Sequence, residues 1–122
     1  MSGEDLKKLL QVIQAGSKGF YPTSGIRQVV SLNPRKLVNV TLIDGSEIEP
    51  HKMYKIVTND FLFNRGDDFS KVANAVHFKN VTKGSLIRDI LLRYVRQYKV
   101  LNTKEKPLID KNFPRLVISS FK

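Results

Sequence analysis

The sequence of 122 residues contains no cysteine and only two histidines. Without cysteine the chain can form no disulfide, thiolate zinc site, iron–sulfur cluster or cysteine nucleophile. Two histidines also exclude a metal site made of three histidines of this chain. No apolar run approaches the ~20 residues that a membrane-spanning helix needs, and the first residues lack both regions of a secretory signal. We therefore expect a soluble chain without a membrane partner, while the cellular compartment stays open.

Acidic residues are scarce relative to basic ones, since 21 Lys and Arg stand against 11 Asp and Glu, a net charge of +10. An excess of this size suits nucleic acid, an anionic surface or a small phosphorylated ligand. The basic residues are scattered rather than gathered in blocks, which favours a role in solubility over a dedicated polyanion surface. Hydrophobic residues make up 41% and charged residues 26%, as in ordinary globular domains.

Two segments have the spacing of amphipathic helices. The first begins at a capping Ser2 and ends at Gly16, and its apolar face holds Leu6, Leu9, Leu10 and Ile13. The second begins at a capping Ser85 and ends near Tyr98. Its basic residues lie on or beside the polar face, opposite the apolar one, and are Arg88, Arg93, Arg96 and Lys99.

Between and after these helices the chain is rich in β-branched residues, which indicates strands. Ile26–Val30 and Leu37–Ile43 are expected to pair antiparallel around a turn at Asn33–Lys36, and Asp44–Gly45 marks another turn. Further expected elements are strands at Lys55–Thr58, Val76–Val81 and Arg115–Ser119 and a loop at Leu101–Asn112. The sequence thus predicts a single α+β domain over residues 1–122, with a mixed, mainly antiparallel sheet flanked by two helices.

The segment Asn59–Phe69 has neither helical nor strand periodicity, and it concentrates three phenylalanines and three aspartates. Gly66 allows a tight turn, and short Asn and Asp side chains can bond the backbone. Phe69 could then present its ring to a purine, although a core position that folds the loop down is the commoner arrangement. Asp60, Asp67 and Asp68 could ligate a hard cation, but hydrogen bonds within the loop are the favoured interpretation.

The chain shows no motif of a complete catalytic site. His51 and His77 have no nucleophile elbow beside them, and neither a phosphate loop nor a dinucleotide fingerprint is present. The sequence also lacks Asp-x-His and Asn-His-Glu/Asp stretches, which supply metal ligands in two-metal phosphoesterases. We therefore assign no catalytic residue and no metal ligand.

Three motifs nevertheless resemble one family. Tyr54–Phe69 resembles the Y-K-V-V-T-N-D-F-L-A-N-G-G-D-G-F signature of the 5′-nucleotidase C-terminal domain. Ser24–Arg27 matches the S-G-I-R element of that family, and Gly3–Lys7 resembles its G-x-x-L-K helix start. The resemblance covers nearly the whole chain and implies a partial C-terminal domain that is truncated at its N-terminal side.

In that family, a metallophosphoesterase domain with two divalent metals performs hydrolysis. The C-terminal domain binds the nucleotide and stacks its base on phenylalanine. The resemblance implies that the nucleotide or nucleoside is bound by Asn64, Gly66, Asp67 and Phe69. It also implies that the metallophosphoesterase domain of the full-length protein is a partner. The metal pair belongs to that absent domain, so no cofactor is expected in this chain. Family members are often extracellular or periplasmic.

The motif departs from the family at three points. Arg65 and Asp68 replace two glycines, and Ser70–Ala75 contains no acid that could hold the ribose hydroxyls. Two other interpretations therefore remain open. The chain could be a small basic domain that binds nucleic acid or another polyanion through the arginines of the second helix, or a purely structural remnant that binds neither ligand.

Overall fold

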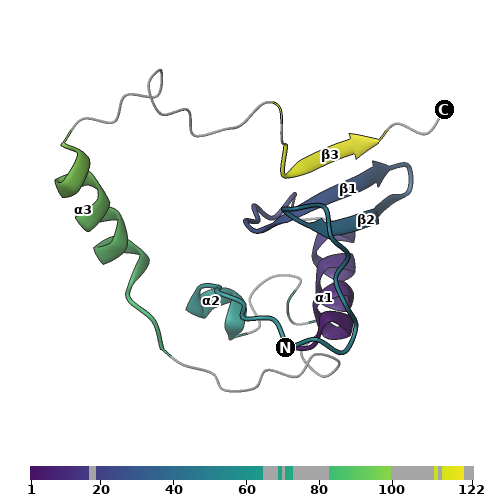
Figure 1. The fold of residues 1–122 in the computed structure, drawn as a ribbon, viewed down its shortest axis with the longest axis horizontal. Coiled ribbons are helices and arrows are strands. Elements are labelled where there is room, and N and C mark those ends of the chain that lie inside the picture. The colour runs from purple at the N-terminus through teal and green to yellow at the C-terminus, as the bar shows by residue number, and fades with distance from the viewer. Residues whose placement is uncertain are drawn as a thin grey trace. The chain divides into compact units, whose positions relative to one another are not determined.

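A computed structural model describes most of the chain, in two compact units (Figure 1). The described residues are 1–16, 19–64, 69, 71–72, 83–99, 112 and 114–119. The first unit comprises Met1–Lys79 and Arg115–Lys122, and the second comprises Asn80–Pro114. Each unit is described by itself.

The first unit opens with α1 (Gly3–Ala15), as the sequence predicts. The Ser2 hydroxyl accepts a hydrogen bond from the backbone N–H of Asp5 at 3.1 Å, which satisfies one of the free donors at the helix start. Glu4 and Asp5 lie in the first turn, where the helix dipole favours negative charge. The helix ends before Gly16, so both predicted ends are confirmed.

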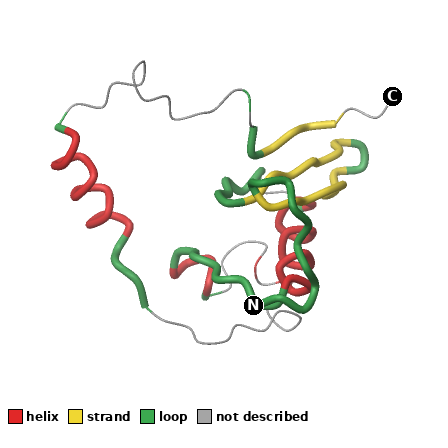
Figure 2. The backbone as a smooth tube through the Cα atoms, in the orientation of Figure 1, coloured by secondary structure: helices red, strands yellow, loops and turns green. Residues whose placement is uncertain are grey.

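The sheet has three strands in the order β2-β1-β3 (Figure 1), which are drawn in yellow in Figure 2. β1 (Ile26–Leu32) and β2 (Arg35–Leu42) form the predicted antiparallel pair, with a β-bulge between Val29 and Val30. β3 (Leu116–Ser119) lies on the other side of β1 and runs parallel to it, with Gln28 opposite Leu116. The α+β class with a mixed sheet is therefore confirmed.

The core of this unit lies where α1 packs against the sheet. The apolar side chains that the helical spacing selected are all among the buried ones, so the prediction of that face is confirmed. Ile48, in the segment after β2, is 1% exposed and completes the core beside the helix start. The buried cluster consists of Met1, Leu6, Leu9, Leu10, Ile13, Ile26, Ile48, Phe69 and Val72.

Polar contacts hold the C-terminal end of α1 to the sheet. Gln14 and Gln28 are both buried, and the Nε2 of Gln14 donates to the Oε1 of Gln28 at 3.0 Å. Arg35 of β2 donates from Nε to the carbonyl of Gln14 at 2.7 Å and from Nη2 to the carbonyl of Gly19. Its guanidinium also lies 4.2 Å from the ring centroid of Phe20. Arg35 thus satisfies a carbonyl that the end of the helix leaves without a partner.

The second unit contains α3 (Ile87–Tyr98), which confirms the second predicted helix. Its N-cap is Leu86, and no side chain caps it, so the prediction that Ser85 caps this helix is wrong. Ser85 lies one residue before the position from which a hydroxyl reaches the first free N–H groups. The rings of Tyr94 and Tyr98, one turn apart, lie with their centroids 4.5 Å apart and their planes tilted by 43°.

Two further expectations differ from the structure. Lys55–Thr58 is not a strand, because it has no ladder partner among the described residues. One turn of helix, α2 (Asp60–Phe63), lies within the segment that lacked periodicity, because a single turn is too short to show any. The predicted strand Val76–Val81 and nearly all of the predicted loop Leu101–Asn112 lie outside the described residues. None of the helices in the described residues has the length and apolar character to cross a membrane.

Candidate functional site

The candidate site begins at α2, which is fixed by short polar side chains. The Oδ1 of Asn59 accepts a hydrogen bond from the backbone N–H of Leu62 at 2.8 Å and so caps the helix. The carboxylate of Asp60 accepts from the N–H of Phe61 at 2.9 Å. For Asp60, the structure therefore agrees with the interpretation that acids of this segment bond the backbone.

Asn64 lies at the end of α2 with an exposed side chain. Its backbone N–H donates to the carbonyl of Asp60 at 2.8 Å, which closes the helical turn. The side chain has both a donor and an acceptor, so it can bond a heterocyclic base or a sugar hydroxyl. Asn64 is therefore placed where a ligand could reach it.

Phe69 is buried rather than presented to solvent. Its side chain is 8% exposed and belongs to the hydrophobic core of the first unit. The ring meets that of Tyr21 edge to face, with centroids 6.1 Å apart and planes at 61°. A ring packed in this way has no open face for a base, so the structure has the alternative arrangement, in which Phe69 folds the segment onto the core.

The structure describes two of the four predicted binding residues, Asn64 and Phe69. Asn64 is exposed and Phe69 is in the core, while Gly66 and Asp67 lie outside the described residues, together with Arg65 and Asp68. Sequence reasoning missed the exposure of Phe61, whose ring is 59% exposed on α2. The sequence signal that bears on this exposure is the position of Phe61 in the helical turn that Asn59 caps. That position does not determine which face of the turn is buried.

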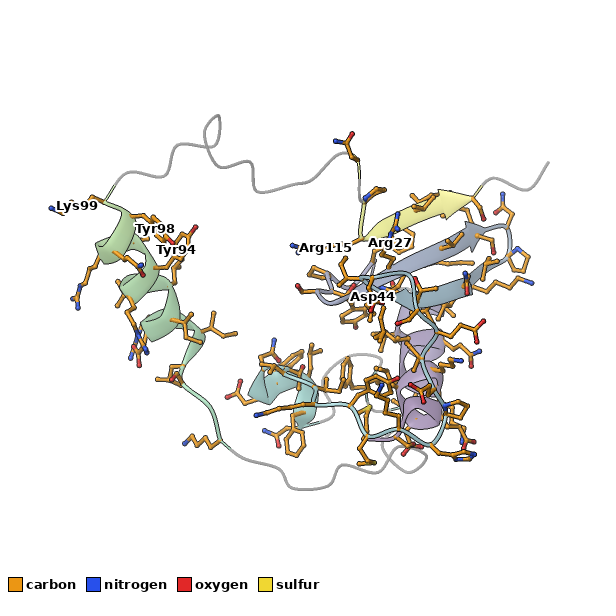
Figure 3. All side chains as sticks on the ribbon, in the orientation of Figure 1. Arg27, Asp44, Tyr94, Tyr98, Lys99 and Arg115 are labelled. Atoms are coloured by element: carbon orange, nitrogen blue, oxygen red, sulfur yellow. The ribbon has the colours of Figure 1, made fainter. Side chains whose placement is uncertain are left out.

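The other motif of the resemblance, Ser24–Arg27, leads into β1. Gly25 has a φ of 84°, a left-handed conformation that glycine adopts without strain. Arg27 follows at the start of β1, and the N–H of Gln28 donates to the carbonyl of Arg115 at 2.8 Å. Arg27 and Arg115 therefore lie at the same end of the sheet (Figure 3).

Among the described residues, acidic and imidazole side chains form no cluster at this site. No three His, Asp or Glu side chains in the described part of the chain are close enough together to hold a metal ion. His51 is exposed at a turn. Asp44, in the turn after β2, accepts hydrogen bonds from the hydroxyl and N–H of Ser46, and these bonds lower the pKa of its carboxyl. These hydrogen bonds stabilise the turn and do not involve α2.

Comparison with known proteins gives one family. Residues 1–75 match the family model described as the 5′-nucleotidase, C-terminal domain. This chain belongs to that family. The match includes all three motifs, from the start of α1 to Phe69, whereas α3 and β3 lie beyond it.

A curated relative of this 5′-nucleotidase family member is a cell wall protein of Listeria monocytogenes. The two are 36% identical over 84 residues, which cover 62% of this chain and 11% of the relative. The chain thus spans about a tenth of the length of the curated relative that it matches. No solved structure matches the chain.

The basic residues of α3 are accompanied by an acid. Arg88, Arg93 and Arg96 are exposed, as is Lys99 just after the helix. Asp89 lies between them in the sequence, with its Oδ1 3.3 Å from the Nε of Arg88. The carboxylate of Asp89 would repel a polyanion that bound along these basic residues.

Proposed function

We propose that this chain is the nucleotide-recognition part of a longer nucleotide hydrolase of the 5′-nucleotidase type. The match over residues 1–75 supports this function, because it contains both the Ser24–Arg27 and the Tyr54–Phe69 motifs. The nucleotide or nucleoside binds at the segment that starts at Asn64 and ends at Phe69, with Gly66 and Asp67 between them. The metallophosphoesterase domain of the full-length protein supplies the metals and the hydrolytic step.

Within this proposal Phe69 has an anchoring role. Its ring is held in the core against Tyr21, and Asn64 is held by the last turn of α2. One end of the binding segment is therefore attached to α2 and the other to the hydrophobic core. A segment with fixed ends loses less conformational freedom when a ligand binds, which favours affinity.

We expect adenosine or AMP to shift the backbone amide signal of Asn64 in an NMR titration, with a dissociation constant of about 1 mM. Asn64→Ala should weaken this binding several-fold, because it removes the exposed amide. The matched variant Asn39→Ala, at an exposed position of β2, should leave binding unchanged.

The same titration distinguishes the two roles of Phe69. Phe69→Leu keeps an apolar anchor and should retain binding, whereas loss of binding with intact folding would show that the ring itself stacks on the base. An unmoved Asn64 signal at saturating adenosine would contradict the proposal. Salt-sensitive shifts that heparin causes in the amides of α3 would instead support the polyanion-binding alternative.

By itself the chain is expected to hydrolyse no nucleotide. It has two histidines and no Asp-x-His or Asn-His-Glu/Asp stretch from which a pair of metal ions could be bound. Incubation with AMP and Mn²⁺, Mg²⁺ or Zn²⁺ should release no more phosphate than buffer does. Phosphate release that a chelator abolishes would refute this expectation.

A further inference from the structure

Phe61 exposes its ring on α2, whereas the ring at the other end of the binding segment is buried. The side chain of Phe61 is 59% exposed, against 8% for Phe69. A base could lie on the ring of Phe69 only by displacing contacts of the hydrophobic core, which include the ring of Tyr21. The ring of Phe61 already offers a π surface that a planar ligand can reach.

The helical turn of α2 brings the ring of Phe61 next to the amide of Asn64. Successive residues of a helix are rotated by about 100°, so residues three apart lie about 60° from each other and their side chains are neighbours. Asn64 still follows this turn, because its N–H donates to the carbonyl of Asp60 at 2.8 Å. Both side chains are exposed. An aromatic ring and a group that both donates and accepts hydrogen bonds therefore lie side by side on this surface.

Contacts on the other side of α2 hold this arrangement in place. Leu62 packs against the hydrophobic core of the first unit, and its position is rotated by about 160° from that of Asn64. At the start of the turn, the side chain of Asn59 accepts from the N–H of Leu62, and that of Asp60 accepts from the N–H of Phe61. The core thus fixes one side of the turn, and Asn64 lies on the side that faces away from it.

We infer that Phe61 and Asn64 recognise an adenine base, an inference that rests on the proposed function and extends its site back to Phe61. The base lies on the ring of Phe61, since every base has a π face. At the edge of the base, the Oδ1 of Asn64 accepts from the exocyclic amino group of adenine, and its Nδ2 donates to the adjacent ring nitrogen. Guanine and hypoxanthine have an oxygen in place of this amino group, which would face Oδ1 with a second acceptor. The pair therefore selects adenine among the purines.

The test is an NMR titration of the chain with adenosine and with inosine, which differs from adenosine only in this exchange of the amino group for an oxygen. Adenosine should shift the amide signals of Phe61 and Asn64, and its own base protons should move upfield because they lie over the ring. Inosine should bind about fivefold more weakly. Asn64→Ala should remove most of this difference, because the selectivity comes from the amide.

The two phenylalanines of α2 provide matched variants. Phe61→Leu keeps an apolar side chain without a ring and should weaken adenosine binding about tenfold, whereas Phe61→Tyr keeps a ring and should retain binding. Phe63→Leu is the control, because Phe63 lies about 160° around the helix from Phe61. It should bind adenosine as the unmodified chain does.

The outcomes separate this inference from the proposed function. If Phe61→Leu bound adenosine as tightly as the unmodified chain, the inference would be overturned and the proposed function would stand. Equal affinities for adenosine and inosine would likewise overturn the role of Asn64 at the edge of the base. An Asn64 signal that saturating adenosine leaves unmoved would contradict the proposed function itself.

Discussion

Gly3→Ala should lower the free energy of unfolding by about 3 kcal/mol, because the first residue of α1 lies against the chain after β2. A Cβ at this position would lie 2.1 Å from the carbonyl oxygen of Glu49 and 2.9 Å from the Cγ2 of Ile48. Backbone cannot move aside as the end of a side chain can, and the N–H of Gly3 also bonds the carbonyl of Lys52. Thermal denaturation should show a fall in Tm of about 10 °C.

Two further variants test the cause of this loss. Gly84→Ala should change stability by less than about 0.5 kcal/mol, since nothing lies within 4 Å of its Cβ position. Combining Gly3→Ala with Ile48→Ala should not restore stability, because the nearest obstacle is a backbone oxygen. If the Gly3→Ala chain were as stable as the unmodified chain, the first residue of α1 would not lie as close to the carbonyl of Glu49 as described.

Arg35→Ala should lower the free energy of unfolding by about 2–3 kcal/mol. The substitution removes two charge-assisted hydrogen bonds to the carbonyls of Gln14 and Gly19 and the contact with the ring of Phe20. Arg35→Lys should recover only part of the loss, since an ammonium cannot reproduce the planar fork of a guanidinium. Urea denaturation followed by circular dichroism measures both changes.

The matched control is the neighbouring Lys36, which is exposed and is also basic. Lys36→Ala should change the unfolding free energy by less than about 0.5 kcal/mol. If Lys36→Ala and Arg35→Ala had equal effects, the loss would reflect the net charge of the turn rather than the bonds that Arg35 makes to the end of α1.

Local patterns predicted those parts of the fold that depend on neighbours in sequence. The apolar spacing and the Ser2 cap predicted α1, and the turn between β1 and β2 predicted their antiparallel pairing. The final strand was also predicted, but its parallel alignment with β1 was not, because residues far apart in the sequence determine that contact. The role of Arg35 was missed for the same reason, since a turn sequence does not show which carbonyls lie nearby.

At the candidate site, the sequence predicted hydrogen bonds within the segment and left open whether Phe69 faces a ligand or the core. Short polar residues do fix the start of the segment, as Asn59 and Asp60 show. The motif alone could not decide whether Phe69 faces a ligand or the core, because the answer depends on Tyr21, which comes from the chain between α1 and β1. Fold class was predictable, whereas the orientation of one ring required tertiary contacts.

The position of β3 has a practical consequence for anyone who expresses part of this protein. The family match ends at residue 75, whereas the third strand of the sheet is contributed by residues 116–119. A fragment trimmed to the matched region would leave the hydrogen-bonding groups of β1 bare on one side, from Gln28 to Ser31. Uncovered strands of this kind pair with other chains, so such a fragment would be prone to aggregate during purification.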